Sequence, residues 1–226
     1  MLIKLKNYIS KNPFLCLLEF ITLILILTTG IIFKQPFWRM LPLCISLVIM
    51  FLQANVSRYA FLLGAGNSVL YAVSYFSVTL YTSAIYALLI SFPLQLITFF
   101  SWNKRSKNNV TELKRMSKLN LFILILICLI SWGILFLIFS LFNSSYMILD
   151  NTVTILGIVS TVLCMLRFSE YTFFQIFCQC VSVIMYCTML SEMPAQSTYL
   201  IYSIYAVICT VISFINMKKN NLKQVK

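Results

Sequence analysis

The chain contains no histidine and only five acidic residues among its 226 positions. It therefore lacks the commonest metal ligand and the usual acid or base for chemistry near neutral pH. No nucleophile motif, zinc motif, phosphate-binding loop or pair of catalytic carboxylates can be found. The eight cysteines form no C-x-x-C pair and lie in apolar runs, so we interpret them as small buried hydrophobic residues. These absences argue against an enzyme, a metal site and a bound cofactor.

Charge of either sign is also scarce. Charged residues make up 10% of the chain and hydrophobic residues 61%, with a mean hydropathy of +0.95. A soluble domain carries roughly 25% charged residues, so the composition indicates an integral membrane protein. The net charge of +12 is confined to the gaps between apolar runs. It forms no basic face with interleaved aromatic residues, which argues against a nucleic-acid partner.

Eight apolar runs are each near the length needed to cross a hydrocarbon core of roughly 30 Å. They cover approximately residues 14–33, 37–56, 60–79, 83–101, 119–141, 151–167, 173–190 and 196–216. The basic N-terminal segment shows no small-residue cleavage site, so the first run is expected to be a spanning helix rather than a signal peptide. The sequence thus predicts an all-α membrane protein with about eight transmembrane helices.

Basic residues lie unevenly about these runs. With a cytoplasmic N-terminus, 15 lysines and arginines fall on the inner side and only Lys34 and Arg39 on the outer side. Such a bias is typical of cytoplasmic loops. We therefore predict a multi-pass protein with both termini in the cytoplasm.

The order of the runs indicates two similar halves. Residues 1–36 would form an N-terminal cytoplasmic segment and an extra helix, followed by a three-helix bundle over 37–101. Residues 102–142 would form a basic cytoplasmic loop and a linker helix. A second bundle over 143–217 and a basic tail over 218–226 complete the chain. This 3+1+3 pattern allows two parallel repeats, and such repeats place a substrate site at their interface near the middle of the membrane.

Amide side chains inside the apolar runs are the main candidates for binding residues. Asn67 and Gln95 lie in the first bundle, and Gln175 and Gln179 share one helix face in the second. Amides offer both donors and acceptors, which suits a neutral polar ligand. The alternative is hydrogen bonding between helices, a common use of amides in membranes. Tyr71 is a further candidate, for stacking on a planar ring.

Three charged residues leave alternatives open. Glu19 is the one acid clearly inside a predicted span, and it would either couple a proton or serve packing near headgroup water. Arg167 and Glu170 are three residues apart at a predicted cytoplasmic helix edge. A local ion pair explains them, and a gate or loop clamp is the alternative.

Several ordered motifs carry a resemblance to a known family. The pattern G-x-x-N-x-x-L-Y-A covers residues 64–72, and a Leu-Tyr pair follows at 80–81. A P-x-Q segment at 93–95 runs to an aromatic end at Trp102, and an Arg-aromatic-x-Glu segment covers 167–170. Together with the run at 181–185, these motifs resemble the PnuC family of bacterial vitamin and nucleoside transporters over approximately residues 40–217. The resemblance implies a SWEET-like 3+1+3 fold in a bacterial plasma membrane. It also implies uniport without ATP hydrolysis, typically of nicotinamide riboside.

Departures from the family pattern cluster in the second half. The family's W-x-x-W pair would fall at Thr172 and Gln175, and an asparagine one turn later at Gln179. Two further family asparagines would fall at Ala87 and Tyr205. A kept scaffold with changed pocket residues favours a related planar, polar ligand, such as a nucleoside or another vitamin. Thr172 and Tyr205 thereby join the candidate binding residues, Tyr205 as a stacking group.

The leading hypothesis is a uniporter for a small, neutral or weakly charged, ring-bearing metabolite, working by alternating access. Its alternatives are a proton-coupled carrier and a non-transporting envelope-assembly protein. Expected partners are a small-molecule substrate and the lipid bilayer, while a homo-oligomer stays open. A cytoplasmic kinase that traps the substrate would be coupled only functionally.

Overall fold

The computed structural model describes residues 13–55, 57–104, 106–107, 110–111, 114–140 and 146–224. The predicted cytoplasmic segment before Pro13 lies outside these ranges. The first half contains α2 (Pro13–Ile32), α3 (Phe37–Ala54), α4 (Tyr59–Phe76), α5 (Tyr81–Ile85), the π-helical η1 (Tyr86–Ser91) and α6 (Phe92–Lys104). The second half contains α7 (Lys118–Ser140), α8 (Met147–Met165), α9 (Tyr171–Met189), the 3₁₀-helix η2 (Pro194–Gln196) and α10 (Ser197–Gln224). Two-residue strands, β1 (Ser106–Lys107) and β2 (Val110–Thr111), pair antiparallel in the basic loop.

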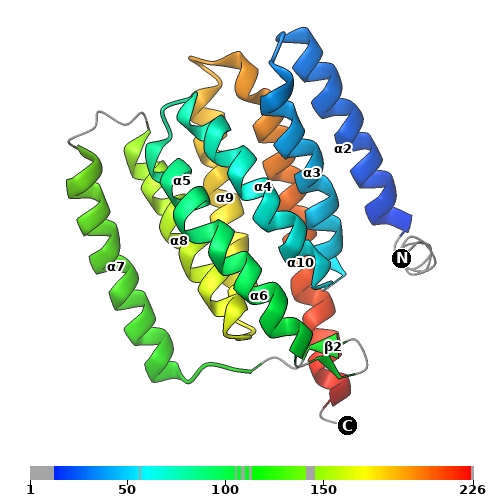
Figure 1. Cartoon of the computed structure of the whole chain (residues 1–226), viewed down its shortest axis with the longest axis vertical. Coiled ribbons are helices and arrows are strands. Elements are labelled where there is room, and N and C mark those ends of the chain that lie inside the picture. Colours follow the sequence, from blue (N-terminus) through cyan, green and yellow to red (C-terminus); the bar gives the residue numbers. More distant parts are fainter. Residues whose placement is uncertain are drawn as a thin grey trace.

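The predicted class, an all-α membrane protein, is confirmed. Within the described residues, seven helical segments are long and apolar enough to cross a membrane, with α5, η1 and α6 forming one of them. The helix α4 is not among the seven, because its 18 residues include Asn67 and several serines and tyrosines. It nevertheless lies between α3 and α6 in the bundle (Figure 1). Its polar residues face protein neighbours, as expected for polar groups at membrane depth.

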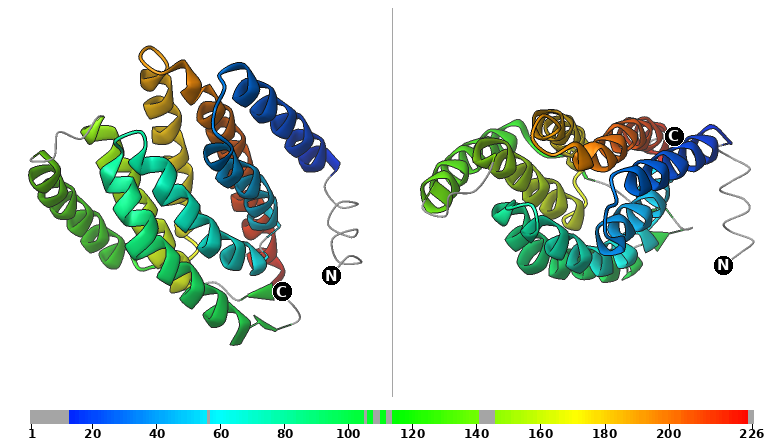
Figure 2. Two further views of the ribbon diagram at one scale, coloured as in Figure 1. Left: turned by 45° about the horizontal axis from the view of Figure 1, so that its top comes forward. Right: turned by 90° about the horizontal axis from the view of Figure 1, so that it is seen from above.

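Six helical segments form a closed ring. Each packs against the next in the order α3, α4, α6, α8, α9 and α10, and α10 packs against α3. Helix α2 lies outside the ring against α3 and α10, and α7 lies outside it against α8 (Figure 2). Each half thus contributes three neighbouring helices to the ring and one outer helix that precedes them.

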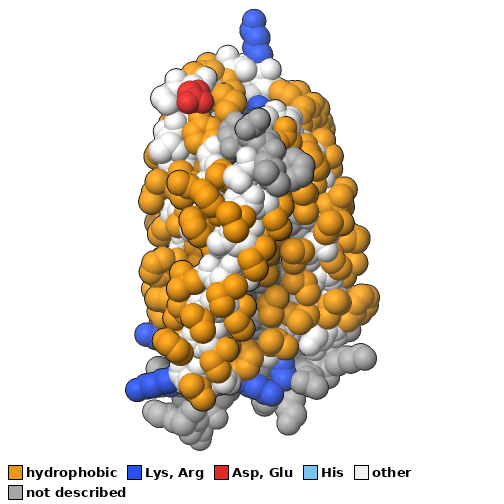
Figure 3. Space-filling model, turned by 90° about the vertical axis from the view of Figure 1, so that its left-hand side faces the viewer, with side chains coloured by type: hydrophobic (Ala, Val, Ile, Leu, Met, Phe, Trp, Pro, Cys, Tyr) orange, Lys and Arg blue, Asp and Glu red, His pale blue; other side chains and the backbone are white. Residues whose placement is uncertain are grey.

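Chain direction relates the two halves as parallel repeats. Helices α3 and α8 run the same way, as do α4 and α9, and α6 and α10 (Figure 1). The start of α2 and the end of α10 lie at the same end of the bundle, and lysines and arginines gather mainly at that end below a broad hydrophobic band (Figures 1 and 3). Helix α10 continues to Gln224, so the predicted boundary of a separate tail at 218 falls inside a helix.

The third span of the first half is broken, which the hydropathy pattern did not predict. Thr79 has a φ of 58° just before α5, and α5 has only five residues. The π-helical turn η1 then precedes Pro93, which has no backbone N–H to bond one turn back. A wider turn before a proline is a common way to accommodate this loss, and such turns are frequent at functional sites.

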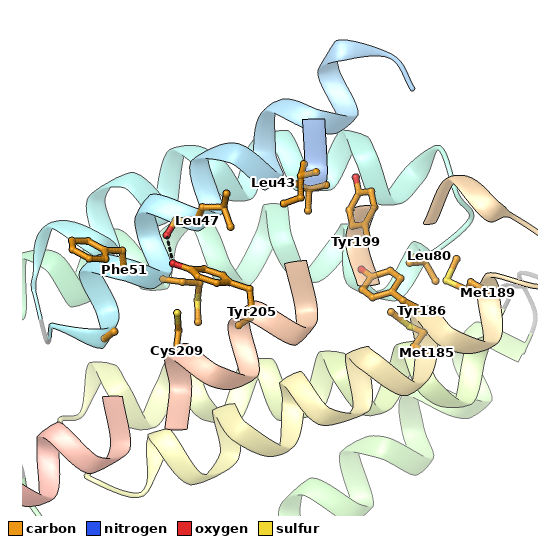
Figure 4. Packing of buried hydrophobic residues seen from close by; sticks show 14 of the residues in the cluster. Leu43, Leu47, Phe51, Leu80, Met185, Tyr186, Met189, Tyr199, Tyr205 and Cys209 are labelled. Carbon is orange, nitrogen blue, oxygen red and sulfur yellow. Dashed lines mark hydrogen bonds between the residues drawn. The ribbon is translucent and has the colours of Figure 1, made fainter. Parts of the chain in front are cut away.

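A hydrophobic cluster closes the ring toward the end where α5 and α10 begin. Leu43, Leu80, Met189, Tyr186 and Tyr199 belong to it and come from both halves (Figure 4). The cysteines contribute partly as predicted. All eight are free thiols, and Cys164, Cys178 and Cys209 are buried, but Cys180 and Cys187 are exposed.

Candidate substrate-binding cavity

A cavity of about 250 Å³ lies inside the ring, between the two halves. Small-molecule pockets usually hold roughly 300–1,000 Å³, so this one is of metabolite size. Every described side chain that lines it is uncharged. Its polar groups are amides, hydroxyls and phenols, contributed by α3, α4, η1, α6, α8, α9 and α10. The amide residues are Gln53, Asn67, Gln95, Gln175 and Gln179, and the tyrosines are 71, 75, 86, 171, 186, 199 and 202.

Asn67 lies on the inner face of α4. It is 3% exposed, and its Nδ2 donates to the carbonyl oxygen of Pro42 at 3.0 Å and to the Ser46 hydroxyl at 2.8 Å. Ser46 in turn donates to the Tyr71 hydroxyl at 2.8 Å. These bonds join α3 to α4, so Asn67 also has the packing role that was the alternative prediction.

Gln95 lies on α6 beside a glycine of α4. Its Nε2 donates to the hydroxyls of Ser68 at 3.0 Å and Ser91 at 2.7 Å. A Cβ added to Gly64 would lie 1.8 Å from the Gln95 Oε1. Gly64 is therefore the residue whose lack of a side chain lets the carboxamide of Gln95 lie here.

The second half repeats this arrangement with a different side chain. Tyr86 of η1 lies against Gly157 of α8, where an added Cβ would be 3.1 Å from the ring. The Tyr86 hydroxyl is 3.0 Å from that of Thr161. Gln175 donates to the Gln53 Oε1 at 2.9 Å, which links α9 to α3 across the cavity wall.

Aromatic rings form the wall near the closed end. Tyr71 and Tyr75 stack with a centroid separation of 5.3 Å and an interplanar angle of 22°. Tyr186 and Tyr199 lie 5.5 Å apart at 37°. Phenol rings can stack on a planar ligand and also attract a cationic ring.

Two predicted binding residues are placed elsewhere. Tyr205 is 1% exposed and its hydroxyl donates to the Leu47 carbonyl at 3.4 Å, inside the hydrophobic cluster (Figure 4). Thr172 is buried and donates to the Ser169 carbonyl at 3.1 Å at the start of α9. Neither lines the cavity, because α10 presents Tyr202 to it and α9 presents Gln175.

The pair Arg167 and Glu170 lies in the turn between α8 and α9. In the described part of the chain no ion pair joins them, and the Glu170 Oε1 instead accepts a hydrogen bond from the Met116 backbone N–H at 3.1 Å. The carbonyl of Arg167, whose φ is 64°, accepts from the Lys114 N–H at 2.7 Å. The turn therefore holds the end of the basic loop, as the loop-clamp alternative predicted.

Sequence reasoning missed the hydroxyl groups that orient the amides. The signal for Ser91 was present, because it is four residues before Gln95 and one helical turn brings the two together. Ser46 and Gln53 gave no such signal, because their partners Asn67 and Gln175 lie on other helices. Tyr86 was noted only as one of several recurring tyrosines.

An uncharged cavity of metabolite size between two parallel three-helix halves defines a multi-pass membrane transporter. The family model described as "Nicotinamide mononucleotide transporter" matches residues 36–218, so the chain belongs to this family. A solved structure titled "Crystal structure of the Vitamin B3 transporter PnuC" is similar with a TM-score of 0.77 and 16% identity, covering 91% of each chain. No curated protein matches the chain. These findings confirm the resemblance to PnuC and the prediction that the protein is a transporter and not an enzyme.

Proposed function

We propose that the protein is a uniporter for an unphosphorylated nucleoside-type vitamin, of which nicotinamide riboside is the first to test. The observation that carries this proposal is the uncharged cavity lined by amides and tyrosines. Amides can hydrogen-bond a carboxamide or ribose hydroxyls, and the tyrosine rings suit a planar ring that is neutral or weakly cationic.

The lack of charge in the cavity argues against a phosphorylated substrate. A phosphate group carries a charge of roughly −1.5 to −2 near neutral pH. Moving it into this cavity would remove its water without offering a cation among the described lining residues. Burying an unpaired charge is costly, so the nucleoside is favoured over the mononucleotide named in the family's description.

Alternating access between the two halves is supported by the contacts at their two seams. Near one end of the α5/α8 and α6/α8 seam, Thr82 donates to Asn151 at 2.9 Å and Ser83 bonds to the buried Asp150. Near its other end, the Trp102 Nε1 donates to the Cys164 carbonyl at 3.1 Å.

The α3/α10 seam is bridged at both ends in the same way. The Tyr199 hydroxyl donates to the Arg39 carbonyl at 3.3 Å near the start of α10, and Asn216 donates to the Ala54 carbonyl at 3.0 Å near its other end. Breaking the contacts at one end and keeping those at the other would expose the cavity to one side at a time.

The alternatives gain no support from the site. Glu19 lies on α2, outside the ring, and does not line the cavity. We propose cytoplasmic termini in the plasma membrane on the basis of the basic end of the bundle, and a trapping kinase as a functional partner only. A homo-oligomer stays a prediction.

Uptake of tritiated nicotinamide riboside into cells lacking their own importers tests the proposal. The expression host with the intact chain should accumulate label, and purified protein should gain thermal stability with the same ligand. Gln95→Leu should abolish uptake while leaving the melting temperature of the free protein close to that of the parent. If a panel of vitamins and nucleosides gives neither uptake nor stabilisation, the transporter proposal is wrong.

A further inference from the structure

The direction of the Asn67 amide follows from a neighbour that can only accept. Its Nδ2 lies 3.0 Å from the carbonyl oxygen of Pro42. A carbonyl oxygen has no hydrogen to donate, so the atom that faces it must be the amide nitrogen. The Asn67 Oδ1 is buried and accepts no hydrogen bond from the described residues. Asn67 therefore brings an unpartnered acceptor to the cavity wall.

The direction of the Gln95 amide follows from a chain of hydroxyl groups. Ser68 donates its hydrogen to the Gly64 carbonyl at 2.9 Å, so toward Gln95 it can only accept. The Gln95 Nε2 lies 3.0 Å from the Ser68 hydroxyl oxygen and 2.7 Å from that of Ser91, which occupies both hydrogens of the nitrogen. The Oε1 lies over Gly64 and accepts no hydrogen bond from the rest of the described chain. Gln95, too, has only an oxygen left for a ligand.

We propose that Asn67 and Gln95 are specificity-determining residues that select a substrate with N–H or O–H donors and reject its carboxylate analogue. The inference rests on the proposed function and names the chemistry of the edge that the site recognises. The carboxamide of a vitamin B3 nucleoside supplies two N–H donors, whereas the carboxylate of the corresponding acid supplies none. The acid would also place a negative charge against two amide oxygens, in a cavity whose described lining has no cation.

Gly64 and Ser68 act in this selection as positioning residues. Gly64 leaves room for the Gln95 oxygen, and Ser68 uses its hydrogen on the Gly64 carbonyl and so holds the Gln95 nitrogen. Without such a hydroxyl partner, a carboxamide can rotate by half a turn and exchange its donor and acceptor ends. The selectivity therefore depends on residues that need not touch the substrate.

Binding of two matched probes to the purified full chain tests the inference. Nicotinamide riboside and nicotinic acid riboside share the sugar and the ring and differ in the carboxamide. We expect the acid to bind at least roughly 10- to 100-fold more weakly, the usual effect of leaving polar groups of a site unpaired. Equal binding, or tighter binding of the acid, overturns the specificity and leaves the proposed function standing. Binding of neither probe overturns both.

Two variants separate the orientation of Gln95 from its mere presence. In Ser68→Ala/Ser91→Ala the amide is free to turn, so the amide-to-acid affinity ratio should fall by about tenfold. Gln95→Glu keeps oxygens at this position and adds negative charge, so the ratio should rise. Thr28→Ala is the matched control, because its hydroxyl bonds to a carbonyl of its own helix, α2, outside the ring. An unchanged ratio in both test variants would show that the Gln95 oxygen does not select the ligand.

Discussion

Replacing Gly64 with alanine is the most direct test of how the cavity is built. The added Cβ would lie 1.8 Å from the Gln95 Oε1 and 2.9 Å from the carbon that carries it. Neither distance is compatible with ordinary contact, so the carboxamide of Gln95 must move. Its two hydrogen bonds to Ser68 and Ser91 then break.

The expected loss of stability is small because two effects oppose each other. Alanine is favoured over glycine inside a helix by up to about 1 kcal/mol. The two lost hydrogen bonds are each worth about 1 kcal/mol. Gly64→Ala should therefore unfold with a free energy about 1 kcal/mol lower than the parent, while losing one of the two amide oxygens offered to the substrate. A loss of roughly 10- to 100-fold in affinity for nicotinamide riboside is expected for one unpaired polar contact.

Gly66 provides a matched control on the same helix. It is exposed, and a Cβ added there would meet nothing within 4 Å. Gly66→Ala should therefore keep full uptake and melt at the same or a higher temperature. Chemical or thermal unfolding in detergent, together with labelled uptake in cells, measures both quantities. If Gly64→Ala and Gly66→Ala transport equally well, Gly64 does not set the position of Gln95.

Three further changes have distinct expected outcomes. Glu19→Gln should leave uptake and its pH dependence unchanged, since Glu19 lies outside the ring; a lost pH dependence would support a proton relay. Glu170→Ala should free the end of the basic loop and increase its cleavage by added protease, with the α8–α9 turn otherwise intact; unchanged cleavage would contradict the clamp. Gly157→Ala should push the ring of Tyr86, 3.1 Å away, into the cavity and lower uptake, whereas Gly133→Ala, with nothing within 4 Å, should not; equal uptake by both variants would show that the ring can shift at no cost.

Spans and the family resemblance could be predicted from the sequence because both depend on local patterns. Runs of apolar residues have the length of a bilayer, and basic residues mark their ends. The break between α5 and α6 was missed because Pro93 follows an apolar stretch that hydropathy treats as continuous. A proline changes the backbone bonding of the preceding turn without changing the hydropathy of the run.

The candidate site was predictable in part. Asn67, Gln95, Gln175, Gln179 and Tyr71 all line the cavity. Tyr205 and Thr172 do not, because a residue's place around a helix depends on which neighbours that helix packs against. The direction of each amide was beyond sequence reasoning, since it depends on a carbonyl or hydroxyl contributed from another helix or another turn.

The outer helices make the two seams mechanically unequal. Helix α2 packs against both α3 and α10, so it covers the seam where those two meet. Gln35, just after α2, adds side-chain bonds to Thr198 and Ala195 at the start of α10. Helix α7 packs against α8 and stays on one side of the other seam. The two halves should therefore swing like a door whose hinge is the α2 side, with the widest opening between α6 and α8. Substrate would then enter and leave along one edge of the ring rather than through its centre.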